Sequence, residues 1–160
     1  MDNQQAKVDD LIWLCGFFDG EGYLGFNRNT RRNCRKVYHY WYPRASFSNT
    51  YEPVLEQIIE ILKSNNLAFN VSKKNRQKTN IKWKDNWSIV IQGYKRCKRF
   101  LDIVTPYLKI KQEQAKLILK WIDSRENHPD FMKGNFGKFN TVSYTEEEVH
   151  LINKVRLYNH

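Results

Sequence analysis

The sequence predicts an α+β fold in which one antiparallel sheet carries its helices on one face. The first observation is the order of elements along the 160 residues, which reads as helix, two strands, helix, two strands and then further helices. The second is the absence of a Pro- or Gly-rich linker, a low-complexity tract or an internal repeat. Because this length suits one compact core, we expect residues 1–160 to form a single domain.

The first predicted helix is the apolar run from Leu11 to Phe18. It follows the acidic pair Asp9–Asp10, which suits the positive end of a helix dipole, and it stops at the two glycines Gly20 and Gly22. The run is hydrophobic all round, which predicts a helix buried on every side.

Two strand pairs follow, at 23–26 with 37–48 and at 68–72 with 87–92. The polar, basic segment 27–36 is expected to connect the first pair. Loose alternation over 37–48 predicts one polar-aromatic face and one more apolar face. Pro43 indicates an edge position or a bulge in this strand.

Helices are predicted over 52–64, 95–104 and 109–123. Pro53 suits the first turn of its helix, and Pro106 ends the second one. Residues 126–140 look irregular. A last helix opens at Thr145 with a capping box and three acids in its first turn.

The charge of the chain indicates a polyanionic partner. Lys and Arg outnumber Asp and Glu by 27 to 17, which gives a formal net charge of +10. DNA and RNA fit this charge. No membrane partner is expected, because no apolar run is long enough to span a bilayer and the first residues are polar, unlike a signal peptide.

The positive charge collects in two acid-free stretches, from Gly22 to Tyr51 and from Ile61 to Lys84, which coincide with the two strand pairs. This predicts a sheet whose polar, basic face lies against phosphates and groove edges, since a two-stranded ribbon fits the major groove. A solvated basic face with no ligand is the alternative. The candidate DNA contacts are Asn27, Arg28, Asn29, Arg31, Arg32, Arg35, Lys36, Tyr38, Tyr40, Tyr42, Arg44, Ser46, Ser48, Ser72, Lys74, Arg76, Lys78, Lys82, Lys84, Lys138 and Asn140.

Three well-separated cysteines, Cys15, Cys34 and Cys97, fit neither a disulfide framework nor a C-x-x-C metal site. We expect structural thiols in a reducing compartment, such as an organelle (mitochondrion or chloroplast) or a prokaryotic cytoplasm.

Candidate chemistry lies in the segment LCGFFDGEG, residues 14–22. Asp19 and Glu21 stand two residues apart at the end of the first helix, beside its last carbonyl groups, which carry partial negative charge. Carboxylate and carbonyl oxygens together make a site for Mg²⁺. The alternative is that both acids are ordinary polar residues at a helix end.

This segment resembles the LAGLIDADG motif of homing endonucleases. Leu14, Gly16, Asp19 and Gly22 stand in matching places, a small Cys replaces the usual Ala, and Glu21 replaces the second Asp. The segments SFSNT (46–50) and YLKIKQEQA (107–115) also look like family segments. The resemblance extends from about residue 10 to residue 123.

The resemblance implies an αββαββα core whose sheet forms a DNA-binding saddle, with helices on the other face. It implies a site-specific endonuclease that cuts both strands of a long, pseudo-palindromic DNA target with Mg²⁺, for which Mn²⁺ or Ca²⁺ can substitute in binding. A chain with one motif implies a homodimer. The expected dimer contacts lie on the motif helix, at Trp13, Cys15, Gly16, Asp19 and Gly20.

The resemblance also assigns roles to single residues. Glu21 and the Gly20 carbonyl would ligate metal, and Asp19 would cap or brace the partner helix with a secondary role near the metal. Asn49 would orient the attacking water, and Lys111 would stabilise charge on the scissile phosphate. Asn49 as a turn former and Lys111 as a surface lysine remain the alternatives, with Lys109 the nearest rival for the latter role.

Two other functions remain open for this sequence. A related fold can serve as an RNA-binding maturase, and a third class would be a DNA-binding protein without catalysis.

Overall fold

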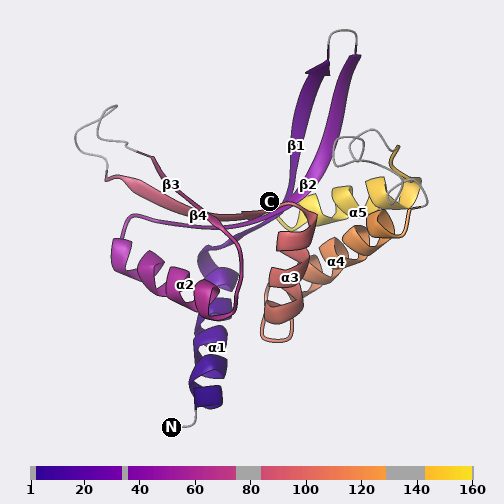
Figure 1. Ribbon diagram of the computed structural model, residues 1–160. Helices are drawn as coiled ribbons and strands as arrows, with labels where there is room; N and C mark the ends of the chain where they lie inside the picture. The colour runs from indigo at the N-terminus through magenta and orange to yellow at the C-terminus, as the bar shows by residue number, and fades with distance from the viewer. Residues whose placement is uncertain (1–2, 34–35, 75–83, 129–142, 160) are drawn as a thin grey trace.

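The computed structural model describes residues 3–33, 36–74, 84–128 and 143–159. Five helices and four strands alternate along them (Figure 1). Their bounds are α1 Asn3–Glu21, β1 Tyr23–Asn33, β2 Lys36–Asn49, α2 Glu52–Ser64, β3 Asn70–Lys74, β4 Asn86–Gln92, α3 Tyr94–Val104, α4 Gln112–Glu126 and α5 Glu146–Leu157.

The strands form one antiparallel sheet in the order β1-β2-β4-β3. In Figure 1 the β1–β2 pair and the β3–β4 pair diverge from the middle of the sheet, and the helices lie beneath them. The predicted α+β class and the predicted face for the helices are therefore confirmed. No helix in the described ranges has both the length and the apolar character that a membrane span requires.

Helix α1 differs from the prediction in two ways. It begins at Asn3, so Asp9 and Asp10 lie inside the helix and do not cap it. It is also buried on one side only. Cys15 is fully buried, whereas Ile12 keeps 52% of its surface exposed and Gly16 is exposed. An all-round hydrophobic pattern does not distinguish a buried helix from one with an apolar side open to solvent.

The first strand pair is longer than predicted, because residues 27–33 continue β1 where a loop was expected. Polar side chains stabilise this extension across the two strands. The Asn29 side-chain amide donates to the Tyr40 hydroxyl at 2.9 Å, and Thr30 Oγ1 lies 3.0 Å from His39 Nδ1. Pro43 lies at the end of the β2–β4 ladder, whose last pair is Arg44 with Gln92, so β2 continues beyond it beside β1 alone.

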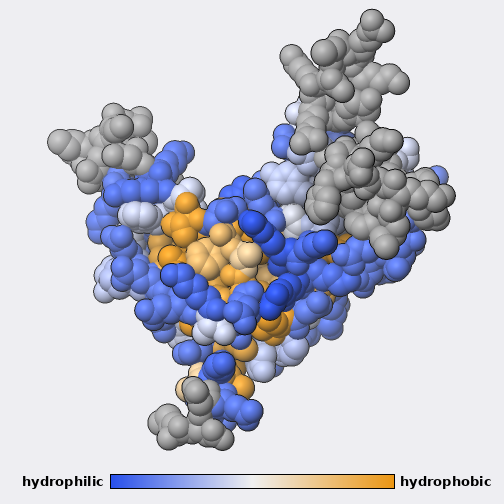
Figure 2. Space-filling model, viewed as in Figure 1, coloured by the Kyte–Doolittle hydropathy of each residue, from blue (hydrophilic) through white to orange (hydrophobic). Residues whose placement is uncertain are grey.

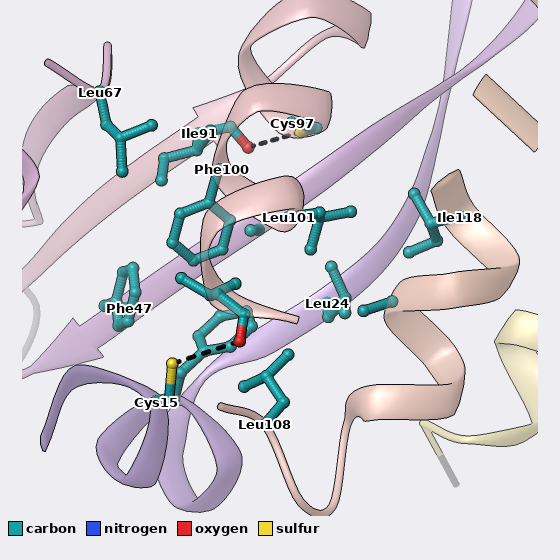
Figure 3. Close-up of a cluster of buried hydrophobic side chains, with 14 of the residues drawn as sticks. Cys15, Leu24, Phe47, Leu67, Ile91, Cys97, Phe100, Leu101, Leu108 and Ile118 are labelled. Carbon is teal, nitrogen blue, oxygen red and sulfur yellow. Dashed lines mark hydrogen bonds between the residues drawn. The ribbon is translucent and has the colours of Figure 1, made fainter. Parts of the chain in front are cut away.

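The core lies between the sheet and the helices (Figure 3). Phe18, Phe47 and Phe100 bring α1, β2 and α3 together, with ring centroids 4.9 to 6.1 Å apart. The Cys15 thiol donates to the Val104 carbonyl within this core. Cys15 thus joins α1 to the end of α3.

The remaining helices agree with the prediction to within a few residues, and the capping box at Thr145 is confirmed. Helix α4 also buries two large side chains. Trp121 and Arg125 are fully buried, and Arg125 forms an ion pair with Glu148 of α5 at 3.2 Å. Because charged residues are almost never fully buried unless they are paired, an arginine in this place was not expected from the sequence.

Candidate functional site

The strand register defines an outer face of the sheet, which points away from the helices. Ala45 and Phe47 of β2 are buried on the helix side, as predicted, so the even-numbered β2 residues from Tyr40 to Ser48 occupy the outer face. The cross-strand neighbours Asn27 and Asn29 of β1 share this face. Within it, Ser46 is buried by its neighbours.

One arginine of the predicted DNA surface falls on the opposite face. Arg28 pairs with Trp41 in the register, and its guanidinium carbon lies 5.9 Å from the centre of the Trp41 ring. Because Arg28 lies in a strand and not in a loop, its side chain alternates in facing with those of its neighbours, which the expectation of a basic connection over 27–36 did not take into account. The side chains of Arg31, Arg32, Lys36 and Tyr38 lie outside the described part of the structure.

The second strand pair adds polar residues to the outer face. Ser72 pairs with Ser88 and Lys74 with Asn86, so the predicted Ser72 and Lys74 lie on this face. Ser88 was missed by the sequence prediction, although its hydroxyl lies 2.8 Å from that of Ser48. Asn70, Asn86 and Gln92 were also missed. Period-two alternation from Ser88 along β4 would have identified Asn86 and Gln92.

Several predicted DNA contacts cannot be assigned to a face of the sheet from the strand register. Lys84 is exposed just before β4. The other six lie outside the described residues, namely Arg35, Arg76, Lys78, Lys82, Lys138 and Asn140.

Asp19 is bound within its own chain. Its carboxylate accepts hydrogen bonds from the backbone amides of Lys109, Ile110 and Lys111 at 2.7, 3.1 and 2.8 Å, and the residue is only 8% exposed. Burial alone would raise the pKa of Asp19, but these three amides outweigh it and hold the pKa below its ordinary value. The expectation that Asp19 braces a partner helix is therefore corrected, because both of its oxygens anchor the segment before α4.

Lys111 lies beside the end of α1. Its ammonium group donates to the backbone carbonyl of Asp19 and lies 5.8 Å from the centre of the Phe18 ring. Burial lowers the pKa of Lys111, while the charges of Asp19 and Glu21 oppose that shift. The structure thus brings Lys111 close to Glu21, across about 90 residues of sequence.

Glu21 ends α1, and its side chain is exposed. Nearby carbonyls are already engaged, since Phe18 accepts from the Gly22 amide and Asp19 accepts from Lys111. The Gly20 carbonyl has no such partner among the described residues. An exposed carboxylate next to a helix-end carbonyl suits a hard divalent cation.

One chain supplies only part of a metal site. The described residues contain no group of three or more His, Cys, Asp or Glu side chains arranged to hold a metal ion. The fit to Mg²⁺ is therefore chemical, through Glu21 and the Gly20 carbonyl, and it requires further ligands.

Asn49 forms a turn. Its side-chain oxygen accepts a hydrogen bond from the Tyr51 amide at 2.9 Å, which joins the end of β2 to the start of α2. This is the turn-forming alternative for Asn49.

The predicted dimer residues divide between two sides of α1. Cys15 and Asp19 face the interior, which corrects their assignment to a dimer surface. Gly16 and Gly20 are exposed, and a methyl group added at either one would meet no atom within 4 Å. Trp13 is half-buried and stacks on Phe17 with ring centroids 5.8 Å apart.

At the level of sequence, no protein-family model and no curated protein matches the chain. Similarity appears in the three-dimensional structure.

Solved structures of homing endonucleases share the fold. The homing endonuclease I-CvuI, in complex with the I-CreI target, superposes with a TM-score of 0.68 at 21% identity, over 96% of this chain and 83% of that one. The archaeal intron-encoded homing endonuclease I-Vdi141I, complexed with DNA, gives 0.56 at 13% identity, over 95% and 98%. The LAGLIDADG homing endonuclease I-LtrWI, bound to target DNA, gives 0.58 at 14% identity, over 92% of this chain but 44% of that one. The chain therefore has the fold of the LAGLIDADG homing endonucleases.

Proposed function

We propose that this protein is a site-specific endonuclease that cuts both strands of duplex DNA as a homodimer, with divalent metal ions held at Glu21. The observation that carries the proposal is the proximity of an exposed Glu21 carboxylate to the Lys111 ammonium group at the end of α1. A metal ligand and a fixed cation both favour catalysis at a phosphate, and these two residues supply them.

Duplex DNA is the substrate that the outer face of the sheet fits best. Amide, hydroxyl and phenol side chains of β1, β2 and β4 cover this face, and such groups reach base edges in the major groove. In Figure 2 the coloured parts of the sheet arms are mostly hydrophilic, and the largest apolar surface of this view lies between them. The superposed homing endonucleases I-CvuI and I-Vdi141I are both complexes with DNA.

The exposed side of α1 supports a homodimer. Ile12, Gly16 and Gly20 form an exposed strip at helical spacing. Glycine inside a helix costs roughly 1 kcal/mol relative to alanine, and nothing in the protomer occupies the space of the missing methyl groups. Close approach of a second copy of α1 explains both glycines. Ile110, 72% exposed and bound through its amide to Asp19, borders the same end of the helix.

A second copy also completes the site. One protomer supplies one Glu21 and one Gly20 carbonyl, whereas paired helix ends supply two of each. The partial coverage of the longer I-LtrWI chain agrees with this, because 92% of the present chain matches less than half of that DNA-bound protein.

The residues divide the chemistry between them. A divalent cation, when bound, polarises the scissile phosphate and activates water. Lys111 stabilises the negative charge that develops on the phosphate, and its bond to the Asp19 carbonyl fixes where its ammonium group sits. Asp19 positions Lys111 by holding the three amides before α4.

The test is cleavage of a plasmid that carries the DNA target of the protein. The reaction is run first with Mg²⁺ and then with EDTA. We expect linear product with Mg²⁺ only, and loss of product in Glu21→Gln at unchanged DNA affinity. Asp102→Asn, an exposed acid on α3, is the matched control and should cut normally. Metal-independent cutting, or full activity in Glu21→Gln, would contradict the proposed mechanism.

Binding at matched salt separates the proposal from an RNA function. Duplex DNA should bind more tightly than the corresponding RNA, and affinity should fall steeply as salt rises. Tighter RNA binding without DNA cleavage would favour a maturase instead.

A further inference from the structure

Arg44 occupies the middle of the outer face of the sheet. The register aligns it with Gly25 of β1 on one side and Gln92 of β4 on the other. Its neighbours on the same face of β2 are Tyr42 and Ser46. These four neighbours are uncharged, so Arg44 is the only charged residue among its nearest neighbours on this face.

The guanidinium of Arg44 is incompletely satisfied. Its Nε is shielded from solvent and has no hydrogen-bond partner, and in the described part of the chain Arg44 has no ion-pair partner. A shielded donor without an acceptor costs free energy, which the side chain recovers if it turns its donors toward an arriving acceptor. A well-paired structural arginine would look like Arg125, which has Glu148 as its counter-ion.

Tyr23 fixes the surroundings of Arg44. Its hydroxyl lies over Gly25, where an added methyl group would come within 2.7 Å of it. Burial raises the pKa of Tyr23, and the nearby positive charges of Arg44 and Arg156 oppose that rise. Tyr23 therefore lies close to the Arg44 guanidinium on the outer face.

We propose that Arg44 reads a guanine in the major groove and so sets one base pair of each half of the target. This inference rests on the proposed function. Guanine presents two adjacent acceptors, O6 and N7, which match the two-pronged donor geometry of arginine. A backbone phosphate offers similar acceptors, but the middle of a ribbon laid in the groove faces base edges. Exposed Lys74, near the end of β3, is better placed for phosphate.

The test is selection of bound duplexes from a random DNA library by the wild-type protein and by Arg44→Gln. The wild-type motif should contain a guanine at two symmetry-related positions. In Arg44→Gln that preference should disappear, while the other positions stay unchanged. On a duplex with the selected motif, the variant should lose roughly ten- to hundredfold in affinity, and the loss should vanish when the guanine is replaced.

Two further variants keep the result decisive. Arg44→Lys retains the positive charge but not the two-pronged donor geometry of arginine. It should therefore weaken the guanine preference, and it serves as the test if Arg44→Gln folds poorly. Lys74→Gln removes a charge from the same face and should weaken all sequences equally, with a lower salt dependence.

The outcomes distinguish this inference from the proposed function. If Arg44→Gln weakens every sequence equally and leaves the motif intact, Arg44 contacts phosphate and the guanine assignment is wrong. A guanine that persists in Arg44→Gln also overturns it. If the wild-type protein enriches no motif at all, the proposed function itself fails.

Discussion

The two sides of α1 have similar residues but different surroundings. On the anchored side, Cys15, Phe18 and Asp19 meet the core or the segment before α4. On the exposed strip, Ile12 keeps 52% of its surface exposed, and the space beside Gly16 is open. One side fixes the helix within its protomer, and the other has the features of a surface that awaits a second helix.

The same contrast separates the two acids of the motif. Asp19 gives both carboxylate oxygens to backbone amides, whereas Glu21, two residues later, stays exposed. Acids that look equivalent in sequence therefore divide into one that builds the site and one that is available to a metal. Substitutions at four positions test these two contrasts.

The largest effect is expected for Asp19→Asn. The new amide group would direct N–H donors at backbone N–H donors, so the free energy of unfolding should fall by about 3 kcal/mol. Urea unfolding measures this, with exposed Asp10→Asn as the control. Unchanged stability would show that the anchor is not needed.

The contribution of Asp19 also depends on pH. The pKa of Asp19 is depressed in the folded protein, so its stabilisation is fully present above the ordinary pKa of an aspartate. It is lost as the pH falls through the lower, folded-state pKa. The stability difference between wild type and Asp19→Asn should therefore shrink in acid.

The next largest effect is expected at Lys111, whose ammonium group lies beside the end of α1. Lys111→Met should slow cleavage by about a hundredfold at unchanged DNA affinity. Because burial lowers the pKa of Lys111, wild-type activity should decline on the alkaline side sooner than for an ordinary lysine. Lys111→Arg stays protonated, so its alkaline decline should be absent in a pH–rate profile. Identical profiles would remove Lys111 from the chemistry.

A smaller effect is expected at the exposed strip. Gly16→Leu should raise the dimer dissociation constant roughly tenfold or more, since a side chain would separate the paired helices. The protomer should remain folded, because the space beside Gly16 is open. Sedimentation equilibrium measures the change. A wild-type protein that stays monomeric at all concentrations would refute the homodimer.

The smallest effect is expected at Cys15. Burial, followed by the charge of Asp19, raises the pKa of its thiol to about 12, so at neutral pH it should react with a thiol reagent only after unfolding. Cys15→Ala should cost about 1 kcal/mol. A Gly16→Cys protein should react rapidly when dilute and slowly when dimeric. Rapid labelling of Cys15 in the folded protein would show that its thiol is accessible and would contradict its place on the buried side of α1.

The sequence predicted the order of the elements well, because glycine, proline and capping residues mark most boundaries. It missed residues 27–33 of β1, where hydrogen bonds such as that from Asn29 to Tyr40 depend on a partner strand. It also missed Arg125, whose burial requires Glu148 from a different helix. Contacts of this kind are not encoded locally.

Within the site, the motif and Lys111 were identified from the sequence, but the use of Asp19 was not. Its three amide partners lie 90 to 92 residues away, so no local pattern indicates them. The assignment of Arg28 to the DNA face failed for a simpler reason, since one missed strand misplaces every second side chain in it.

Glu148 performs two tasks at the start of α5. One carboxylate oxygen accepts from the Thr145 amide, as the capping box requires, and also from Arg125 of α4 at 3.2 Å, while the other accepts from Ser124. The first turn of α5 and its docking on α4 therefore form together. Neither can fray alone without exposing the cap or leaving a buried charge without this partner. In hydrogen exchange the start of α5 should consequently open in one cooperative step with the end of α4, and not by gradual unwinding.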